Sequence, residues 1–238
     1  MSKNHETSVL TAGQMKELSS AILEAIPANL PTSTAQYWIG NKKRLQKALR
    51  EALGIQPFFD LLADWQQFYL NVFGGHYDFS DIVISEKKSG FDRLIIVAPG
   101  MTPQVLFNKC SGLFKTWKYT NKDLDEVIIS DRTPAKGAYA IWLRDRIEAD
   151  EEMKNISANQ IKQQQIITCT LEERILYELK YFKETNQHLD VQKITLCAGS
   201  RNQSGVVPNV RWYGSKMFVG WYNPDDQDDL LRARAAVI

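Results

Sequence analysis

Cysteine is scarce in this chain of 238 residues, which has three, and none of them belongs to a CxxC pair. An odd number of widely spaced cysteines excludes a disulfide scaffold and does not indicate a structural zinc site. The formal net charge of +1 excludes a polycationic nucleic-acid coat. A P-loop and a GxGxxG turn are also missing, so no nucleotide-binding motif of known mechanism is present.

Long apolar runs are missing as well, and no stretch approaches the ~18 apolar residues of a transmembrane helix. The N-terminal sequence MSKNHETSVL has no apolar segment typical of a secretory signal. We therefore expect no membrane association and a location in the reducing cytoplasm, although export that reads no N-terminal signal stays open. A hydrophobic content of 44% predicts a folded chain rather than a disordered one.

Hydrophobic periodicity divides the chain into three parts. Residues 1–10 are expected to form a flexible tail, residues 11–74 an N-terminal helical unit and residues 75–238 an α+β core domain. Within the helical unit, apolar residues recur every three or four positions, and short breaks separate the helices. This is the outline of a three-helix or helix-turn-helix unit.

The core domain mixes helices and strands without regular βαβ alternation. We therefore expect an α+β fold with a mixed, mainly antiparallel sheet and packed helices. The sequence Thr170-Leu-Glu-Glu173 predicts a capping box at the start of a helix. Two hairpins are predicted, one from the β-rich runs at 82–84 and 94–97 and one spanning residues 210–222, and a last helix is expected over residues 230–236.

Charges of both signs are concentrated in residues 130–152, on either side of the apolar run AYAIWL. If a helix has begun by Arg144, three acids of this segment lie on one helical face. Paired carboxylates there could hold a divalent metal for phosphodiester hydrolysis. The alternative is that these charges have no catalytic role and form exposed intrahelical ion pairs. The candidate catalytic residues of the hydrolase hypothesis are Asp131, Asp145, Glu148 and Glu152.

A second candidate site is the Gly/Ser loop that follows the predicted strand of residues 194–197. Backbone amides in such a loop, together with a guanidinium, can bind phosphate or carboxylate. Cys197 itself is expected to be a buried strand residue, because no histidine stands at a spacing that indicates a base. The candidate ligand-binding residues of this loop and of the charged segment are Arg132, Arg144, Arg146, Ser200 and Arg201.

A basic helix over residues 41–53 is the third candidate. Beside the helix-turn-helix outline it suggests contact with DNA phosphates, although short basic helices are also common on ordinary surfaces. The candidate nucleic-acid-binding residues are Lys42, Lys43, Arg44 and Lys47.

The fourth candidate is the C-terminal hairpin, where aromatic residues lie beside Arg211 and Lys216. Aromatic rings with bases on a sheet can stack nucleobases. Because side chains alternate across a strand, Arg211 and Trp212 face opposite sides, so part of this set belongs to the core. The aromatic residues are Trp212, Tyr213, Phe218, Trp221 and Tyr222.

Four phrases resemble a bacterial protein family that has no established function. They lie at residues 139–152 (YAIWLRDRIEADEE), 171–185 (LEERILYELKYFKET), 196–201 (LCAGSR) and 221–237 (WYNPDDQDDLLRARAAV). The resemblance covers most of residues 91–238. It implies no activity, cofactor or catalytic residue.

Three functions remain open from the sequence. The leading hypothesis is a non-enzymatic binding or adaptor module for an anionic ligand, either nucleic acid or a phosphorylated molecule. The rival is a metal-dependent hydrolase or nuclease, which alone calls for a divalent metal; no other cofactor is indicated. The third is a protein-interaction module, which predicts an exposed apolar patch built from residues 57–73. The oligomeric state is not indicated.

Overall fold

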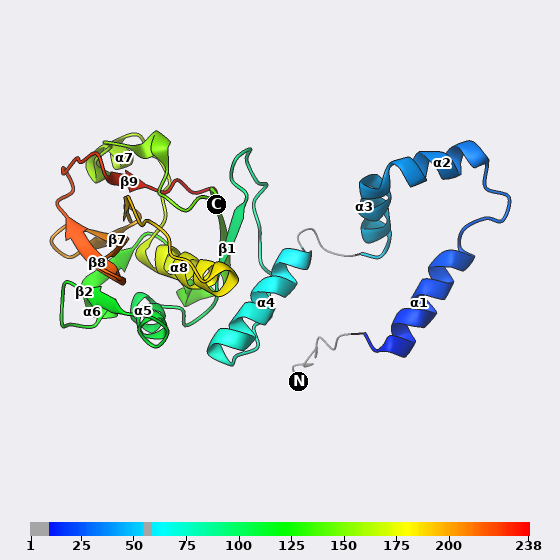
Figure 1. The fold of residues 1–238 in the computed structure, drawn as a ribbon, viewed down its shortest axis with the longest axis horizontal. Coiled ribbons are helices and arrows are strands. Elements are labelled where there is room, and N and C mark those ends of the chain that lie inside the picture. The colour runs from blue at the N-terminus through cyan, green and yellow to red at the C-terminus, as the bar shows by residue number, and fades with distance from the viewer. Residues whose placement is uncertain (1–9, 55–58) are drawn as a thin grey trace. The chain divides into compact units, whose positions relative to one another are not determined.

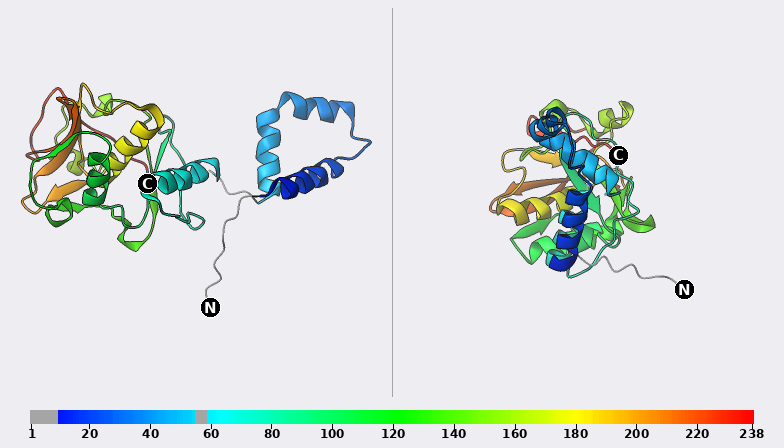
Figure 2. Two further views of the ribbon diagram at one scale, coloured as in Figure 1. Left: turned by 60° about the horizontal axis from the view of Figure 1, so that its bottom comes forward. Right: turned by 90° about the vertical axis from the view of Figure 1, so that its right-hand side faces the viewer.

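The computed structural model describes residues 10–54 and 59–238. The chain divides into two compact units, the first ending at Phe59 and the second running from Asp60 to Ile238. Across the described residues there are eight α-helices, one mixed sheet and two small antiparallel pairs, which confirms the α+β class (Figures 1 and 2). No helix in these two stretches is long and apolar enough to cross a membrane.

The first unit contains three helices, α1 (Ala12–Glu24), α2 (Thr32–Gly40) and α3 (Lys42–Ala52). A capping box starts α1, because Thr11 Oγ1 accepts a hydrogen bond from Gln14 N while the Gln14 side chain accepts one from Thr11 N. Neither α1 nor α2 buries a residue. Neither helix therefore rests on a core: α1 has its capping box and local propensity, and α2, which has no side-chain N-cap, has local propensity.

The helix α4 (Phe59–Phe73) belongs to the second unit, because its aromatic side chains pack on β1 (Arg93–Val97). Trp65 Nε1 donates to the Leu94 carbonyl at 3.2 Å, and the Tyr69 hydroxyl donates to the Ile96 carbonyl at 2.7 Å. Both rings are buried. The division of the chain thus falls before this helix, which the sequence groups with the N-terminal helices. The aromatic patch expected by the protein-interaction hypothesis is, in its described part, largely core.

The main sheet has the strand order β2-β8-β7-β5-β9. The central strand β7 pairs antiparallel with β5 and β8, whereas the outer strands β2 and β9 run parallel to their neighbours. The β7–β8 pair is the C-terminal hairpin that the sequence predicts. The five strands are β2 (Thr116–Lys118), β5 (Ile194–Leu196), β7 (Val207–Tyr213), β8 (Lys216–Tyr222) and β9 (Leu231–Ala233).

Two smaller pairs complete the strands. β1 pairs antiparallel with β4 (Tyr139–Leu143), and β3 (Ile128–Ser130) pairs antiparallel with β6 (Ser200–Asn202). The second pair brings the start of the charged segment beside the Gly/Ser loop. The remaining α-helices are α5 (Pro103–Ser111), α6 (Leu124–Val127), α7 (Ala158–Gln163) and α8 (Leu171–Thr185), and short 3₁₀ turns occupy Pro134–Lys136 and Glu151–Met153.

The helix α8 is the centre of the second unit. It begins at the predicted capping box, in which Glu173 accepts from Thr170 N at 2.7 Å. Every residue from Leu171 to Lys180 is buried, so the helix is covered on all sides by α5, β1 and β7. It lies against one face of the sheet (Figure 1).

The other face of the sheet is only partly covered. Ile161 of α7 packs with Ile194, Leu196 and Leu231, which covers the end formed by β5 and β9. On the β2–β8–β7 end, Trp117 stays exposed. The exposed Trp221 reaches the pocket at this end from the end of β8, although alternation along β8 groups it with Met217 and Val219. We call this uncovered part the open sheet face.

Two local predictions are wrong. Residues 82–84 form no strand. Residues 231–233 form a strand rather than a helix, because their backbone pairs with β5 and the sheet buries both Leu231 and Ala233. There tertiary pairing outweighs local propensity. The alternative of a helix that has begun by Arg144 is not realised, since Arg144 follows β4 without helical structure.

Candidate functional site

The candidate catalytic carboxylates have separate partners. Asp145 accepts a hydrogen bond from the Tyr177 hydroxyl at 3.2 Å. Glu148 accepts one from the backbone N–H of Lys193 at 2.8 Å, and Glu152 is paired with an arginine. Among the described residues no three His, Cys, Asp or Glu side chains are grouped so that they could hold a metal ion. These acids therefore do not form the convergent set that the hydrolase hypothesis requires.

Two of the candidate arginines neutralise acids of their own segment. Arg144 forms an ion pair with the buried Asp150. Arg146 forms a bidentate ion pair with Glu152, in which Nη1 lies 2.7 Å from Oε2 and Nη2 lies 3.0 Å from Oε1. Asp150 draws the chain after β4 inward, which explains why this segment does not continue as an exposed helix.

The junction of β3 and β6 joins the charged segment to the Gly/Ser loop. Ser130 donates to Glu172 and lies 2.7 Å from the Ser200 hydroxyl, which in turn accepts from Leu171 N at 2.8 Å. Ser200 thus caps the start of α8. Burial, and next the neighbouring Glu173 carboxylate, raises the pKa of Glu172 to about 7.

At this junction Arg132 and Arg201 differ in how many of their guanidinium nitrogens have hydrogen-bond partners. Arg132 makes two hydrogen bonds of 2.8 Å to the buried Glu173. Arg201 is half-buried; its Nη2 contacts the Ala158 carbonyl at 3.4 Å, and its Nη1 has no hydrogen-bond partner among the residues that the structure describes. Asp131 is exposed and lies near Arg201. A ligand-binding role for Arg201 stays a prediction.

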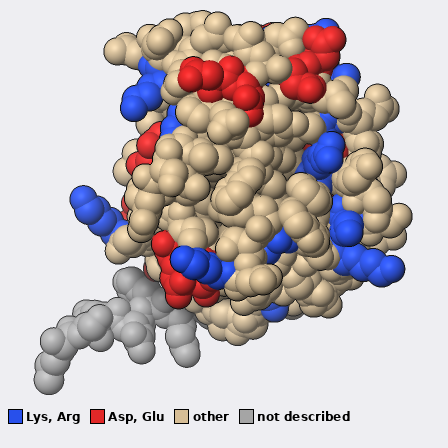
Figure 3. Space-filling model, turned by 90° about the vertical axis from the view of Figure 1, so that its left-hand side faces the viewer, with Lys and Arg blue, Asp and Glu red and all other residues tan. Residues whose placement is uncertain are grey.

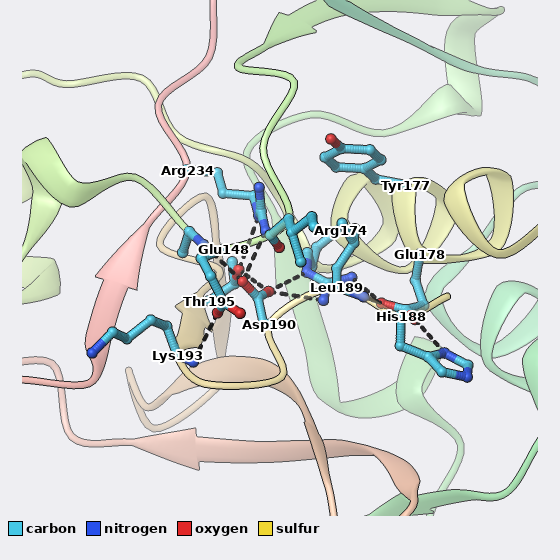
Figure 4. Close-up of polar contacts among 12 residues, drawn as sticks. Glu148, Arg174, Tyr177, Glu178, His188, Leu189, Asp190, Lys193, Thr195 and Arg234 are labelled. Carbon is cyan, nitrogen blue, oxygen red and sulfur yellow. Dashed lines mark hydrogen bonds and ion pairs between the residues drawn. The ribbon is translucent and has the colours of Figure 1, made fainter. Parts of the chain in front are cut away.

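A buried ion network that the sequence does not reveal surrounds Asp190 (Figure 4). Arg174 and Arg234 each approach its carboxylate to 2.8 Å, and Thr195 donates a further hydrogen bond. Ala149 N donates to the same group. All three charged residues are almost completely buried.

The same network continues to His188. Glu178 binds Arg174 at 2.9 Å and His188 Nδ1 at 2.8 Å. The imidazole stacks on the Trp212 ring with centroids 3.4 Å apart. This network ties α8 to β5, β7 and the segment that follows β9, and because it is enclosed we interpret it as structural.

The basic helix α3 forms as predicted over most of its length. Lys42 is exposed, and the Arg44 guanidinium lies against the Tyr37 hydroxyl. The side chains of Lys43 and Lys47 are outside what the structure describes. The nucleic-acid role of this helix stays a prediction.

Side-chain alternation places one continuous set of residues on the open sheet face. Phe218 of β8 lies between Trp117 of β2 and Arg211 of β7. Next to it on β8, Gly220 lies opposite Asn209 of β7. Met217 and Val219 point to the α8 side and are fully buried. Figure 3 views the molecule from the side on which β8 lies in Figure 1; the middle of that side is largely uncharged, and Lys and Arg gather along one edge.

A pocket of about 200 Å³ opens in this face. Two aromatic pairs line it: Trp117 stacks on Phe218 with centroids 4.1 Å apart, and Tyr119 meets Trp221 at 3.9 Å. Trp117 is 40% exposed and Trp221 is 51% exposed. Large rings that are exposed and yet held by a neighbour are suited to stacking on a flat ligand.

Charge is distributed unevenly along the open sheet face. At one end lie Lys115, Lys216 and Arg211, and none of the three has an ion-pair partner in the described stretches. The Arg211 guanidinium lies 4.3 Å from the centroid of the Tyr213 ring. At the other end Asp228 lies near Tyr222, whose pKa is raised by burial and, after it, by that carboxylate. An anionic ligand is therefore favoured at the Lys115 end.

The sequence identifies part of this site. Arg211, Phe218, Trp221 and Tyr222 stand in the predicted hairpin, but Trp117, Tyr119 and Asn209 are missed. The alternation in Lys115-Thr-Trp-Lys-Tyr119 is the signal that could have found the first two, because it is typical of a short strand with one aromatic face. Nothing in the sequence marks Asn209.

Comparisons with models of known protein families, with curated proteins and with solved structures found no match to this chain. No residue role is transferred from a relative. The site is therefore argued from its geometry alone.

Proposed function

We propose that this protein binds single-stranded nucleic acid on the open sheet face. The observation that carries the proposal is one face that combines two exposed aromatic pairs with three cations lacking a carboxylate partner among the described residues. Stacking of a base on an aromatic side chain contributes about 1–3 kcal/mol, and cations in reach of the backbone release counterions from the phosphates. No catalytic step is part of the proposal.

The arrangement of the rings supports stacking rather than core packing. The Trp117 ring is stacked on Phe218, and the Trp221 ring is packed against Tyr119. Because both indole rings are already restrained, they lose little conformational freedom when a base covers them. The phosphates would run toward Lys115 and Lys216, away from the acids of residues 225–229. The basic helix α3 would add phosphate contacts of its own.

The buried free thiols Cys110, Cys169 and Cys197 fit a reducing compartment. These thiols support our proposal that the protein is cytoplasmic.

The test is a fluorescence-anisotropy titration of labelled single-stranded RNA and DNA of mixed sequence with the full chain. At ~50 mM salt we expect binding that weakens steeply toward ~200 mM. Trp117→Ala should lower the affinity about 5- to 150-fold, the equivalent of one lost stacked base. Val83→Ala, which removes an exposed apolar side chain outside the sheet, serves as the control. Absence of binding at ~50 mM salt, or equal affinity in Trp117→Ala, contradicts the proposal.

A further inference from the structure

Asn209 lines the pocket of the open sheet face, and its side-chain amide has no hydrogen-bond partner among the described residues. The residue is 3% exposed, yet its side-chain amide makes no hydrogen bond within the described chain. Buried amides are normally paired, because an unmade hydrogen bond lowers the stability of the fold. The amide of Asn202 shows the usual case, since its oxygen accepts from Ser204 N and Val206 N. The amide of Asn209 instead faces the pocket, where a ligand can reach it.

The space in front of this amide is kept free by a glycine. Asn209 pairs with Gly220 across the β7–β8 ladder. A Cβ at position 220 would lie 3.1 Å from Asn209 Nδ2, 3.3 Å from its Oδ1 and 2.8 Å from Phe218 Cε1. The pocket thus contains a donor and an acceptor side by side, next to an aromatic pair.

We propose that this pocket holds one adenine base whose edge is hydrogen-bonded by the Asn209 amide, an inference that rests on the proposed function. An asparagine amide donates to N7 and accepts from the N6 amino group of adenine at the same time. Guanine presents two acceptors, N7 and O6, on that edge and matches the amide only on its pairing edge, through O6 and N1–H, whereas adenine matches it on either edge, through N6–H with N7 or N1. Pyrimidines offer a matching pair on their pairing edge but a smaller area for stacking on Trp117 or Trp221.

The test compares uridine strands that carry a single central adenosine, guanosine or cytidine, each titrated into the full chain. The wild type is expected to bind the adenosine strand about 5- to 150-fold more tightly than the others, which corresponds to one two-pronged base contact. Asn209→Leu is expected to abolish this preference while the all-uridine strand still binds. Asn209→Ser provides a second variant that keeps a polar group.

Several outcomes overturn the inference and leave the proposed function standing. They are binding of all strands with equal affinity, a preference for cytidine or guanosine, and an adenosine preference that survives in Asn209→Leu. No binding of any strand contradicts the proposed function itself. Adenine can also come from a free nucleotide: displacement of the adenosine strand by AMP supports a free nucleotide as ligand, and its failure supports the strand.

The melting temperature of Asn209→Leu separates a binding role from a structural one. Because the amide has no internal partner, we expect the variant to melt at the same or a higher temperature than the wild type. A clear decrease would identify Asn209 as a structural residue and overturn the inference.

Discussion

Asn209 and Gly220 face each other across the β7–β8 ladder, one with an unpartnered amide and the other without a side chain. Together they make a hollow in a sheet surface that is otherwise covered by the rings of Phe218, Trp117 and Trp221. The hollow depends on both residues, because any side chain at position 220 would cover the amide.

Adding a methyl group at position 220 should therefore close the pocket. We expect Gly220→Ala to fold normally, since the glycine does not need a left-handed backbone, and to lower the affinity for single-stranded nucleic acid. Gly112→Ala is the matched control, because its new Cβ would meet only ordinary contacts on α5. Equal affinities of the two variants, measured by anisotropy, would argue against a ligand in this pocket.

Removal of the Asp190 carboxylate should be strongly destabilising. Asp190→Ala leaves Arg174 and Arg234 buried without their shared counter-ion, and breaking a buried pair costs roughly 3–5 kcal/mol. Asp92→Ala breaks the exposed pair with Lys87 and should cost less than about 1 kcal/mol. Urea unfolding of both variants measures the difference. Similar losses in the two variants would contradict the structural role of the network.

Glu172 should make stability fall as the pH rises. Its pKa is raised from 4.5 to about 7 in the folded chain, so the folded state holds a proton that the unfolded state has released. The stabilisation is complete below pH 4.5 and is lost as the pH rises toward 7. Relative to Glu172→Gln, the wild type should lose on the order of 3 kcal/mol over this range.

Urea unfolding at about pH 5 and about pH 8 tests this sign. Glu152 is the control of opposite sign: its hydrogen bond with Arg146 lowers its pKa to about 2, so its contribution is lost as the pH falls. Because Glu152 is half-exposed, the effect of Glu152→Gln should be small. A wild type that gains stability over Glu172→Gln with rising pH would contradict the prediction.

The basic helix α3 should contribute sequence-independent binding. Joint replacement of Lys42, Lys43 and Arg44 by Gln is expected to weaken all strands alike and to make the plot of log K against log salt shallower by about 2. Replacement of Glu17 and Glu24 of α1 by Gln is a control that changes the charge of the same unit without removing a Lys or Arg side chain. An unchanged salt slope would place the phosphate contacts elsewhere.

The α+β class, the helix at Thr170 and the terminal hairpin could be predicted because each has a local signal: a periodic pattern, a capping box or a turn. The β3–β6 and β5–β9 pairs have no such signal. They join segments far apart in the sequence through strands of three residues, which are too short for alternation to be read. The burial of Arg234 has no local signal for the same reason, since only the pairing of β9 makes the residues around it buried.

The residues of the candidate site likewise fall into those that have a local sequence signal and those that have none. The aromatic residues of the hairpin could be predicted from the sequence, because alternation separates Phe218 from Met217. Trp117 joins them only through parallel pairing of β2 with β8. Asn209 looks like an ordinary strand residue until its burial and its missing partner are known. The carboxylates of 131–152 do not converge, because Asp145 and Glu148 have partners in distant segments whereas Glu152 is paired within its own.

The central claim is that bases stack on Trp117 and Trp221. The chain has six tryptophans, so the indole N–H region of a ¹⁵N–¹H correlation spectrum gives one resonance for each. On addition of single-stranded RNA to the full chain, we expect the resonances of Trp117 and Trp221 to shift while those of the buried Trp65 and Trp142 stay in place. Binding that shifts Trp38 of α2 and leaves Trp117 and Trp221 unmoved would contradict the account.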